Sequence, residues 1–98
     1  MSQKAFPHIA KSAKFAPTAV FIGDVYIKDN CVIEENVTID GRESRTVIQN
    51  GSTIGEGTVI KGTEDRTEIG ENAKIGKNCK ISISVPDGKI LEDNSEWK

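Results

Sequence analysis

Large apolar residues recur along this chain at a spacing close to six residues. They are Ile9, Phe15, Ile22, Ile27, Ile33, Ile39, Ile48, Ile54, Ile60, Ile69, Ile75 and Ile81. Most steps are six residues; a seven and a five together span two repeats, and each of two nines adds three residues to one repeat. An α-helix, with a period of about 3.6 residues, cannot keep such positions on one face. The pattern therefore excludes a helical fold.

A second register of small and turn-forming residues accompanies the first. Four residues after most large positions stands a small or β-branched residue, as at Ala13, Ala19, Cys31, Val37, Ser52, Thr58, Ala73, Cys79 and Val85. Glycine directly follows the large residue at Gly23, Gly55, Gly70 and Gly76, which is too frequent for long uninterrupted strands. A hexapeptide repeat fits both registers, because each unit forms one short strand and one bend, and three units close a triangular coil. We predict an all-β chain whose large residues point inward, with glycine or a polar residue at each bend.

The repeat predicts a single domain of stacked coils at residues 9–26, 27–47, 48–68 and 69–86, with a short cap at residues 87–98. In the cap we expect Ile90 and Leu91 to cover the strand edges of the last coil. Trp97 either joins this cap or lies in a disordered tail.

The second and third coils are each three residues longer than the repeat requires. The additional residues follow the third unit of each coil, within DGRESRT (40–46) and KGTEDRT (61–67). Both charged segments should therefore leave the same corner of the prism, one above the other. They either project into solvent or form a subunit contact or a small polar site.

Charge and composition exclude several classes of function. The 98 residues include 13 basic and 15 acidic side chains, a net charge of −2, which gives no attraction to nucleic acid or to anionic membranes. No apolar run approaches the roughly 18 residues of a membrane span, and residues 1–17 lack the apolar segment of a secretory signal. We therefore expect a cytoplasmic protein. Cys31 and Cys79 occupy small inward positions, and we interpret both as core residues.

Two stretches resemble a known family. FAPTAVFIGDVYI (15–27), with its seven-then-five spacing, and VPDGKILEDNS (85–95) are similar to segments of the gamma-class carbonic anhydrase-like proteins. The hexapeptide pattern itself is shared with hexapeptide acyltransferases, so it indicates the fold more securely than the function. The resemblance implies a single-stranded left-handed parallel β-helix and a homotrimer. Family members usually continue into a C-terminal helix, and no helical segment is predicted here.

The metal site of that family is altered in this sequence. Active members hold zinc or a similar metal with three histidines between neighbouring subunits, and the resemblance places those histidines at Lys61, Lys77 and Ser82. A charged lysine has no lone pair with which to bind zinc. The family's Arg-Gly-Asp stretch is reversed here, as Asp40-Gly41-Arg42. The one histidine, His8, precedes the first coil. We therefore expect no metal, no cofactor, and no carbonic anhydrase activity.

Three hypotheses of function follow from these residues. The first is a non-catalytic member of the family that acts as a small trimeric binding or assembly module. The second is an enzyme or anion-binding protein that uses Lys61 and Lys77, with Ser82, Asp40 and Arg42 as further candidate ligand-binding residues. The third and weakest is acyl transfer, because hexapeptide acyltransferases need a histidine in the cleft and usually have more coils. We predict the first and assign no catalytic residue.

Overall fold

The computed structural model describes residues 7–98, and every regular element in this part of the chain is a β-strand. The strands are β1 (His8–Ile9), β2 (Lys14–Phe15), β3 (Val20–Ile27), β4 (Val32–Ile33), β5 (Thr38–Ile48), β6 (Thr53–Ile54), β7 (Val59–Lys61), β8 (Arg66–Ile69), β9 (Lys74–Ile75), β10 (Lys80–Ile81), β11 (Ile90–Leu91) and β12 (Glu96–Trp97). All of their pairings are parallel. A helix of the length and apolarity needed to cross a membrane does not occur within residues 7–98. The predicted single-stranded parallel β-helix is confirmed.

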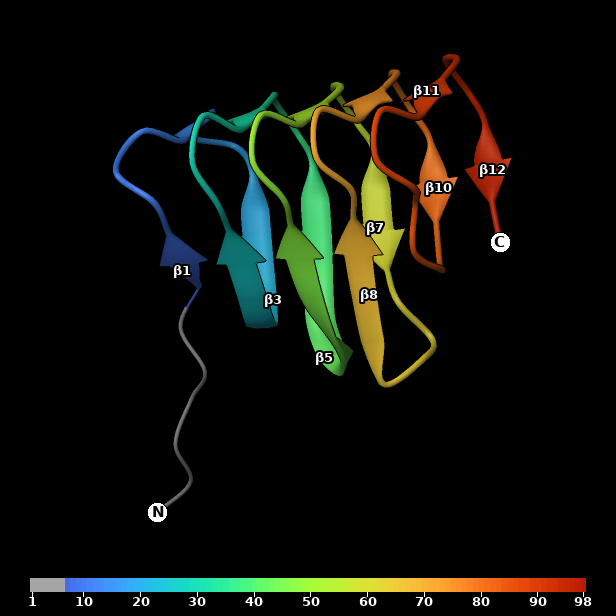
Figure 1. Cartoon of the computed structure of the whole chain (residues 1–98), viewed down its shortest axis with the longest axis horizontal. Helices are drawn as coiled ribbons and strands as arrows, with labels where there is room; N and C mark the ends of the chain where they lie inside the picture. Colours follow the sequence, from blue (N-terminus) through green and yellow to red (C-terminus); the bar gives the residue numbers. More distant parts are fainter. Residues whose placement is uncertain (1–6) are drawn as a thin grey trace.

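The strands wind around a prism with three faces (Figure 1). The first face holds β1, β8 and the second halves of β3 and β5; the second face holds β2, β4, β6, β9 and β11. The third face holds β7, β10, β12 and the first halves of β3 and β5. Because β3 and β5 bend around one corner, the first and third faces form a single seven-stranded sheet. The winding is left-handed.

Each face contributes one column of inward residues to the core. The columns are Ile9, Ile27, Ile48, Ile69 and Val85; Phe15, Ile33, Ile54, Ile75 and Leu91; and Phe21, Ile39, Ile60, Ile81 and Trp97. Ile48, Ile54 and Ile60, in the middle coil, are fully buried, whereas Phe15 in the first coil is 48% exposed. Burial of the apolar side chains in each coil is therefore completed by the coils above and below it.

In the first coil the inward residue of the third face is Phe21, and the prediction of Ile22 was wrong. Phe21 packs against the core, while Ile22 lies in register with Asp40 in an outward column. The pairing of β3 with β5 shifts between Gly23 and Val25 because β5 carries three additional residues at this point, and Gly23 has a φ of 78°. With Phe21 in the column, the first coil has regular six-residue steps.

The bends lie three residues after the inward positions and are made by asparagine and glycine. Positive φ angles occur at Asn30, Asn36, Gly51, Gly57, Asn72, Asn78, Gly88 and Asn94, the residue types that tolerate this conformation best. The positive φ angle of the middle bend belongs to Gly57, whereas Gly55 begins this bend and accepts a hydrogen bond from the Thr58 N–H at 3.3 Å. A Cβ atom there would lie 2.5 Å from the carbonyl oxygen of Gly76, so Gly55 permits the close stacking of successive coils.

Residues 85–98 continue the solenoid as a partial fifth coil. Val85 bridges Ile69 and so begins this coil, although the sequence pattern predicts it as a small residue of the coil before. Leu91 is buried as predicted for the cap, whereas Ile90 points outward and is 66% exposed.

Trp97 closes the C-terminal end of the described prism. It packs against the core, and its indole N–H donates a hydrogen bond to the carbonyl oxygen of Ser84 at 2.8 Å. The Lys89 ammonium lies 5.2 Å from the centre of the indole ring, a cation–π distance. Trp97 is therefore part of the cap rather than a free tail.

Candidate functional site

A groove of about 610 Å³ crosses β7, β10 and β12 on the third face. It is lined by Glu43, Val59, Lys61, Thr63, Lys80, Ile81, Ser82, Glu96 and Lys98. Three ammonium groups, two carboxylates and two hydroxyls thus surround the exposed apolar side chain of Val59.

The six-residue register brings these side chains together from three successive coils. Lys80 pairs with Val59 on one side and with Glu96 on the other. Lys61 and Lys98 directly follow inward residues of the third face, so they belong to one outward column that runs along the prism axis.

The lysines of the groove have weak acidic partners. The Lys98 ammonium lies 3.1 Å from a Glu96 oxygen, and the Lys61 ammonium lies 4.0 Å from a Glu43 oxygen. The hydrogen bond from Lys98, together with the charges of Lys98 and Lys80, lowers the pKa of Glu96. These side chains are all more than half exposed, so water screens both pairs.

Ser82 lies between Lys61 and Lys98 in the outward column. Its backbone N–H donates to the carbonyl oxygen of Trp97 at 2.9 Å, and its half-buried side chain lines the groove. The hydroxyl is 3.5 Å from the same carbonyl oxygen, a long contact that leaves the hydroxyl able to bind another group.

Lys77, the second predicted lysine, lies outside this groove. It is exposed at the corner between the second and third faces, and its backbone N–H donates to a carboxylate oxygen of Asp93 at 2.8 Å. Within one chain, Lys61 and Ser82 therefore come together, and Lys77 does not join them.

Asp40 and Arg42 form a closed pair beside the groove. Two guanidinium nitrogens of Arg42 donate to the two Asp40 oxygens at 3.0 and 2.8 Å, and the Arg42 backbone N–H adds a third bond of 3.0 Å. These side-chain hydrogen bonds lower the pKa of Asp40, with a smaller contribution from Lys61. The Asp40 carboxylate is 7% exposed, so the pair stabilises the bend of β5 rather than offering a free ligand.

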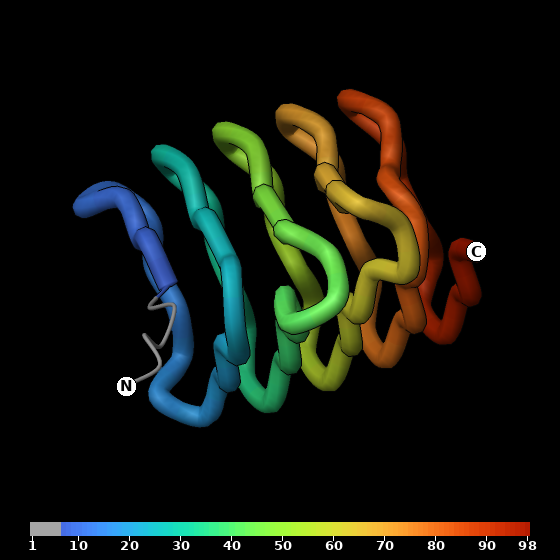
Figure 2. The backbone as a smooth tube through the Cα atoms, turned by 90° about the horizontal axis from the view of Figure 1, so that it is seen from below, coloured from blue at the N-terminus to red at the C-terminus, as the bar shows by residue number. Residues whose placement is uncertain are grey.

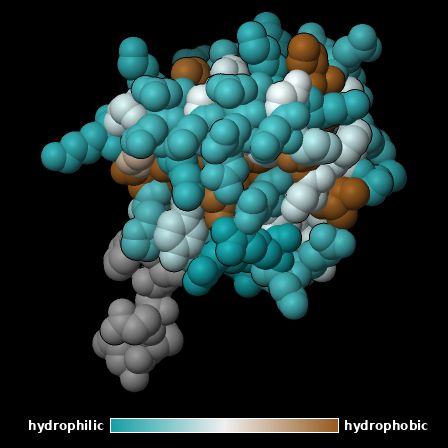
Figure 3. Space-filling view, in the orientation of Figure 1, coloured by the Kyte–Doolittle hydropathy of each residue, from teal (hydrophilic) through white to brown (hydrophobic). Residues whose placement is uncertain are grey.

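The two predicted charged segments do lie side by side at one corner (Figure 2). Arg45 binds Asp24 at 2.8 Å and lies over the Tyr26 ring, and Arg66 binds Glu68. Hydrophilic side chains gather along this lower edge of the prism (Figure 3). Because the arginines are already paired with acids, the corner has little capacity for an added ligand.

Below those charges, the same corner has a buried polar layer. Ser44, Thr46 and Thr67 are almost fully buried. The hydroxyls of Ser44 and Thr67 are hydrogen-bonded at 2.8 Å, and the Thr46 hydroxyl donates to the carbonyl oxygen of Ser44 at 2.9 Å. The segments are therefore partly structural, and simple projection into solvent does not describe them.

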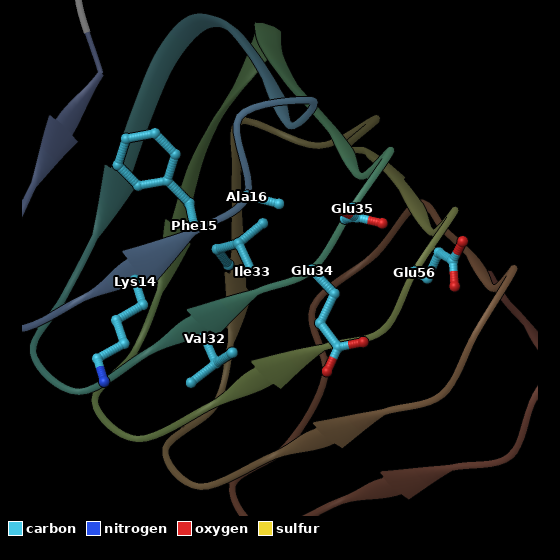
Figure 4. A pocket seen from close by; sticks show the side chains of 8 residues that line it. All are labelled: Lys14, Phe15, Ala16, Val32, Ile33, Glu34, Glu35 and Glu56. Atoms are coloured by element: carbon cyan, nitrogen blue, oxygen red, sulfur yellow. The ribbon is translucent and has the colours of Figure 1, made fainter.

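A smaller hollow of about 360 Å³ lies near the N-terminal end of the second face. It is lined by Lys14, Phe15, Ala16, Val32, Ile33, Glu34, Glu35 and Glu56, with the Phe15 ring set apart from the carboxylates of Glu34 and Glu56 (Figure 4). These polar groups do not converge on one point, so we assign no chemistry to this hollow.

The remaining candidates for chemistry have structural roles in the described chain. His8 stacks on Tyr26, with ring centres 4.5 Å apart. Cys31 and Cys79 are buried, and burial is the main reason that the pKa of Cys31 is raised, which disfavours a reactive thiolate. No group of three or more His, Cys, Asp or Glu side chains within residues 7–98 is arranged to hold a metal ion.

Comparisons with known proteins add little to this description. No family model matches the chain, and no curated protein matches it. The acetyltransferase domain of PglB from Neisseria gonorrhoeae, solved with acetyl coenzyme A, is 18% identical, with a TM-score of 0.28. The match covers 91% of this chain and 55% of that chain. A likeness at this level bears on neither activity nor ligand.

Lys80, Lys98 and Glu96 are groove residues that the sequence predictions did not include. Their signal lay in the repeat: Lys80 immediately precedes the inward Ile81, and Lys98 immediately follows Trp97. Recognising Lys98 required knowing that Trp97 continues the column of Ile81.

Proposed function

We propose that this protein is a non-catalytic relative of the gamma-class carbonic anhydrase-like proteins, acting as a small trimeric binding or assembly module. The observation that carries the proposal is the loss of ligands at the family's metal positions, which hold Lys61, Lys77 and Ser82. Charged ammonium groups cannot bind zinc, and a serine hydroxyl is a poor replacement for imidazole.

The third face supports assembly because its N-terminal half presents apolar side chains outward. Val20 is 46% exposed, and the half-buried Ile22 lies on the same face. Flat apolar sheet surfaces favour contact with another protein surface. Packing of this face between subunits would bury these residues.

The assembly is tested by sedimentation equilibrium of the full chain. We expect the mass of three chains, and we expect Val20→Asp to shift the protein toward the monomer because it places a charge in the contact. Val32→Asp is the matched control, since Val32 is 38% exposed on the second face. A monomeric mass at every concentration would refute the trimer.

The absence of the family's catalysis is tested on the same preparation, purified without chelator. We expect substoichiometric zinc, iron and cobalt by elemental analysis, and no acceleration of carbon dioxide hydration. One metal ion per chain at neutral pH would contradict the proposal.

A further inference from the structure

We infer that the groove on the third face binds a small molecule with an anionic group at each end of an apolar body. Lys61, Lys80 and Lys98 supply the cationic contacts, and Ser82 supplies a hydroxyl between them. The site is built within one chain, so this inference goes beyond the proposed function and does not depend on it.

The spacing of the lysines favours an elongated ligand. Lys61 ends β7, Lys80 begins β10, and Lys98 directly follows β12, so the three belong to successive rungs. Adjacent strands lie about 4.8 Å apart, which separates Lys61 and Lys98 along the axis by roughly 10 Å. An anion with two charged groups at this separation contacts both lysines, whereas a single small anion contacts one end.

The floor of the groove favours an apolar connection between the charged groups. Val59 is 39% exposed, and it lies beside Lys80 in one outward column and two residues before Lys61 on β7. A methylene chain over the Val59 side chain removes apolar surface from water, which a hydrated polyanion does not achieve. The volume of about 610 Å³ accommodates such a molecule.

The native carboxylates compete with the ligand but do not block it. Glu96 and Glu43 pair with Lys98 and Lys61 at 3.1 and 4.0 Å, and exposed pairs of this kind are easily exchanged. Lys80 has no ion pair within 4 Å among residues 7–98. It is therefore the cation most available to an incoming anion.

The test is calorimetric titration of the full chain, at low ionic strength, with linear dicarboxylates from butanedioate to decanedioate. We expect affinity to peak from heptanedioate to nonanedioate, whose extended lengths approach the two-rung separation of roughly 10 Å. Octanoate, with one carboxylate, should bind more weakly than octanedioate. Equal affinity along the series, or no binding of any member, would overturn the inference.

Amino-acid substitutions distinguish binding in the groove from nonspecific attraction of the dicarboxylate to surface lysines. Lys80→Ala should weaken octanedioate binding about tenfold through loss of a charge-assisted contact. Glu96→Gln should tighten it about threefold by removing the competing carboxylate. Lys74→Ala, which removes an exposed lysine from the second face, should have no effect. Equal weakening by Lys74→Ala and Lys80→Ala would refute the site, while subunit mass and metal content test the proposed function separately.

Discussion

At the scale of single residues, neighbouring side chains have very different roles because alternate positions face opposite sides of the sheet. Ile39 is fully buried in the core, and the next residue, Asp40, belongs to the outward column, where Arg42 closes over it. The Asp40 carboxylate is shielded from water by the partner that neutralises it, so the pair is more than an exposed ion pair.

The pH dependence of stability should report this pair. Arg42 lowers the pKa of Asp40 in the folded state, so the unfolded carboxyl binds protons more readily and stability rises with pH. The contribution is present above the unfolded pKa of about 3.9 and is lost as the pH falls through the folded pKa. We expect Arg42→Gln to flatten the acid limb of the free energy of unfolding, measured by urea denaturation from pH 2 to 6.

Arg66→Gln serves as the control for that measurement. Arg66 pairs with Glu68, and both side chains are at least 38% exposed, so the acid limb should keep most of its slope. Equal flattening in both variants would contradict the assigned role of Asp40.

At the scale of elements, the corner that carries the two inserted segments shows how loops can be incorporated into a solenoid. β5 continues through its insertion and pairs first with β7 and then with β8. Gly62 begins the connection between β7 and β8, and a Cβ atom there would overlap the Thr67 hydroxyl and approach Ser44 Oγ to 2.7 Å. The buried hydroxyl layer therefore needs glycine at this position.

Gly62→Ala should destabilise the protein by about 1–3 kcal/mol, the usual cost of overpacking a tight site. The next residue provides the control, because Thr63 is exposed and Thr63→Ala should change stability by less than about 0.5 kcal/mol. Chemical denaturation of both variants measures the difference. A Gly62→Ala protein as stable as the parent would show that the corner can relax.

At the scale of the whole molecule, a charged side chain covers the C-terminal end of the described prism. At this end, Lys89 occupies the position that Ala73 holds one coil earlier, as the hydrogen-bond register shows. The other residues in this column are small. The charged side chain of Lys89 covers the Trp97 ring. Charged side chains that point inward at a sheet edge discourage pairing with another chain.

Removal of this charge should promote end-to-end association. Lys89→Ala restores a small residue to the column and uncovers Trp97, so we expect its sedimentation coefficient to rise with concentration more steeply than that of the parent. Lys77→Ala, at an exposed corner, should behave like the parent. Indistinguishable sedimentation of the two variants would argue against a protective role for Lys89.

Sequence and structure agree most closely where the repeat is regular. From Ile27 to Ile81 the inward residues and the stacked insertions follow the predicted register, because each hexapeptide forms the same short strand and bend. The prediction failed at Ile22, where two adjacent apolar residues compete for one inward position. It was also incomplete in the groove, because Lys80 and Lys98 acquire a shared environment only when coils stack.

The sequence by itself determined the solenoid, its coil length and the corner from which the insertions leave. Coils of three hexapeptides turn residues with a six-residue period inward, and so bury the isoleucines. Only the tertiary structure decided that Phe21, and not Ile22, points inward, that a fifth coil forms, and that Lys61, Lys80 and Lys98 lie together. The physical reason is distance along the chain: these outcomes depend on contacts between coils some 16 to 21 residues apart, and no local pattern specifies which side chains will meet there.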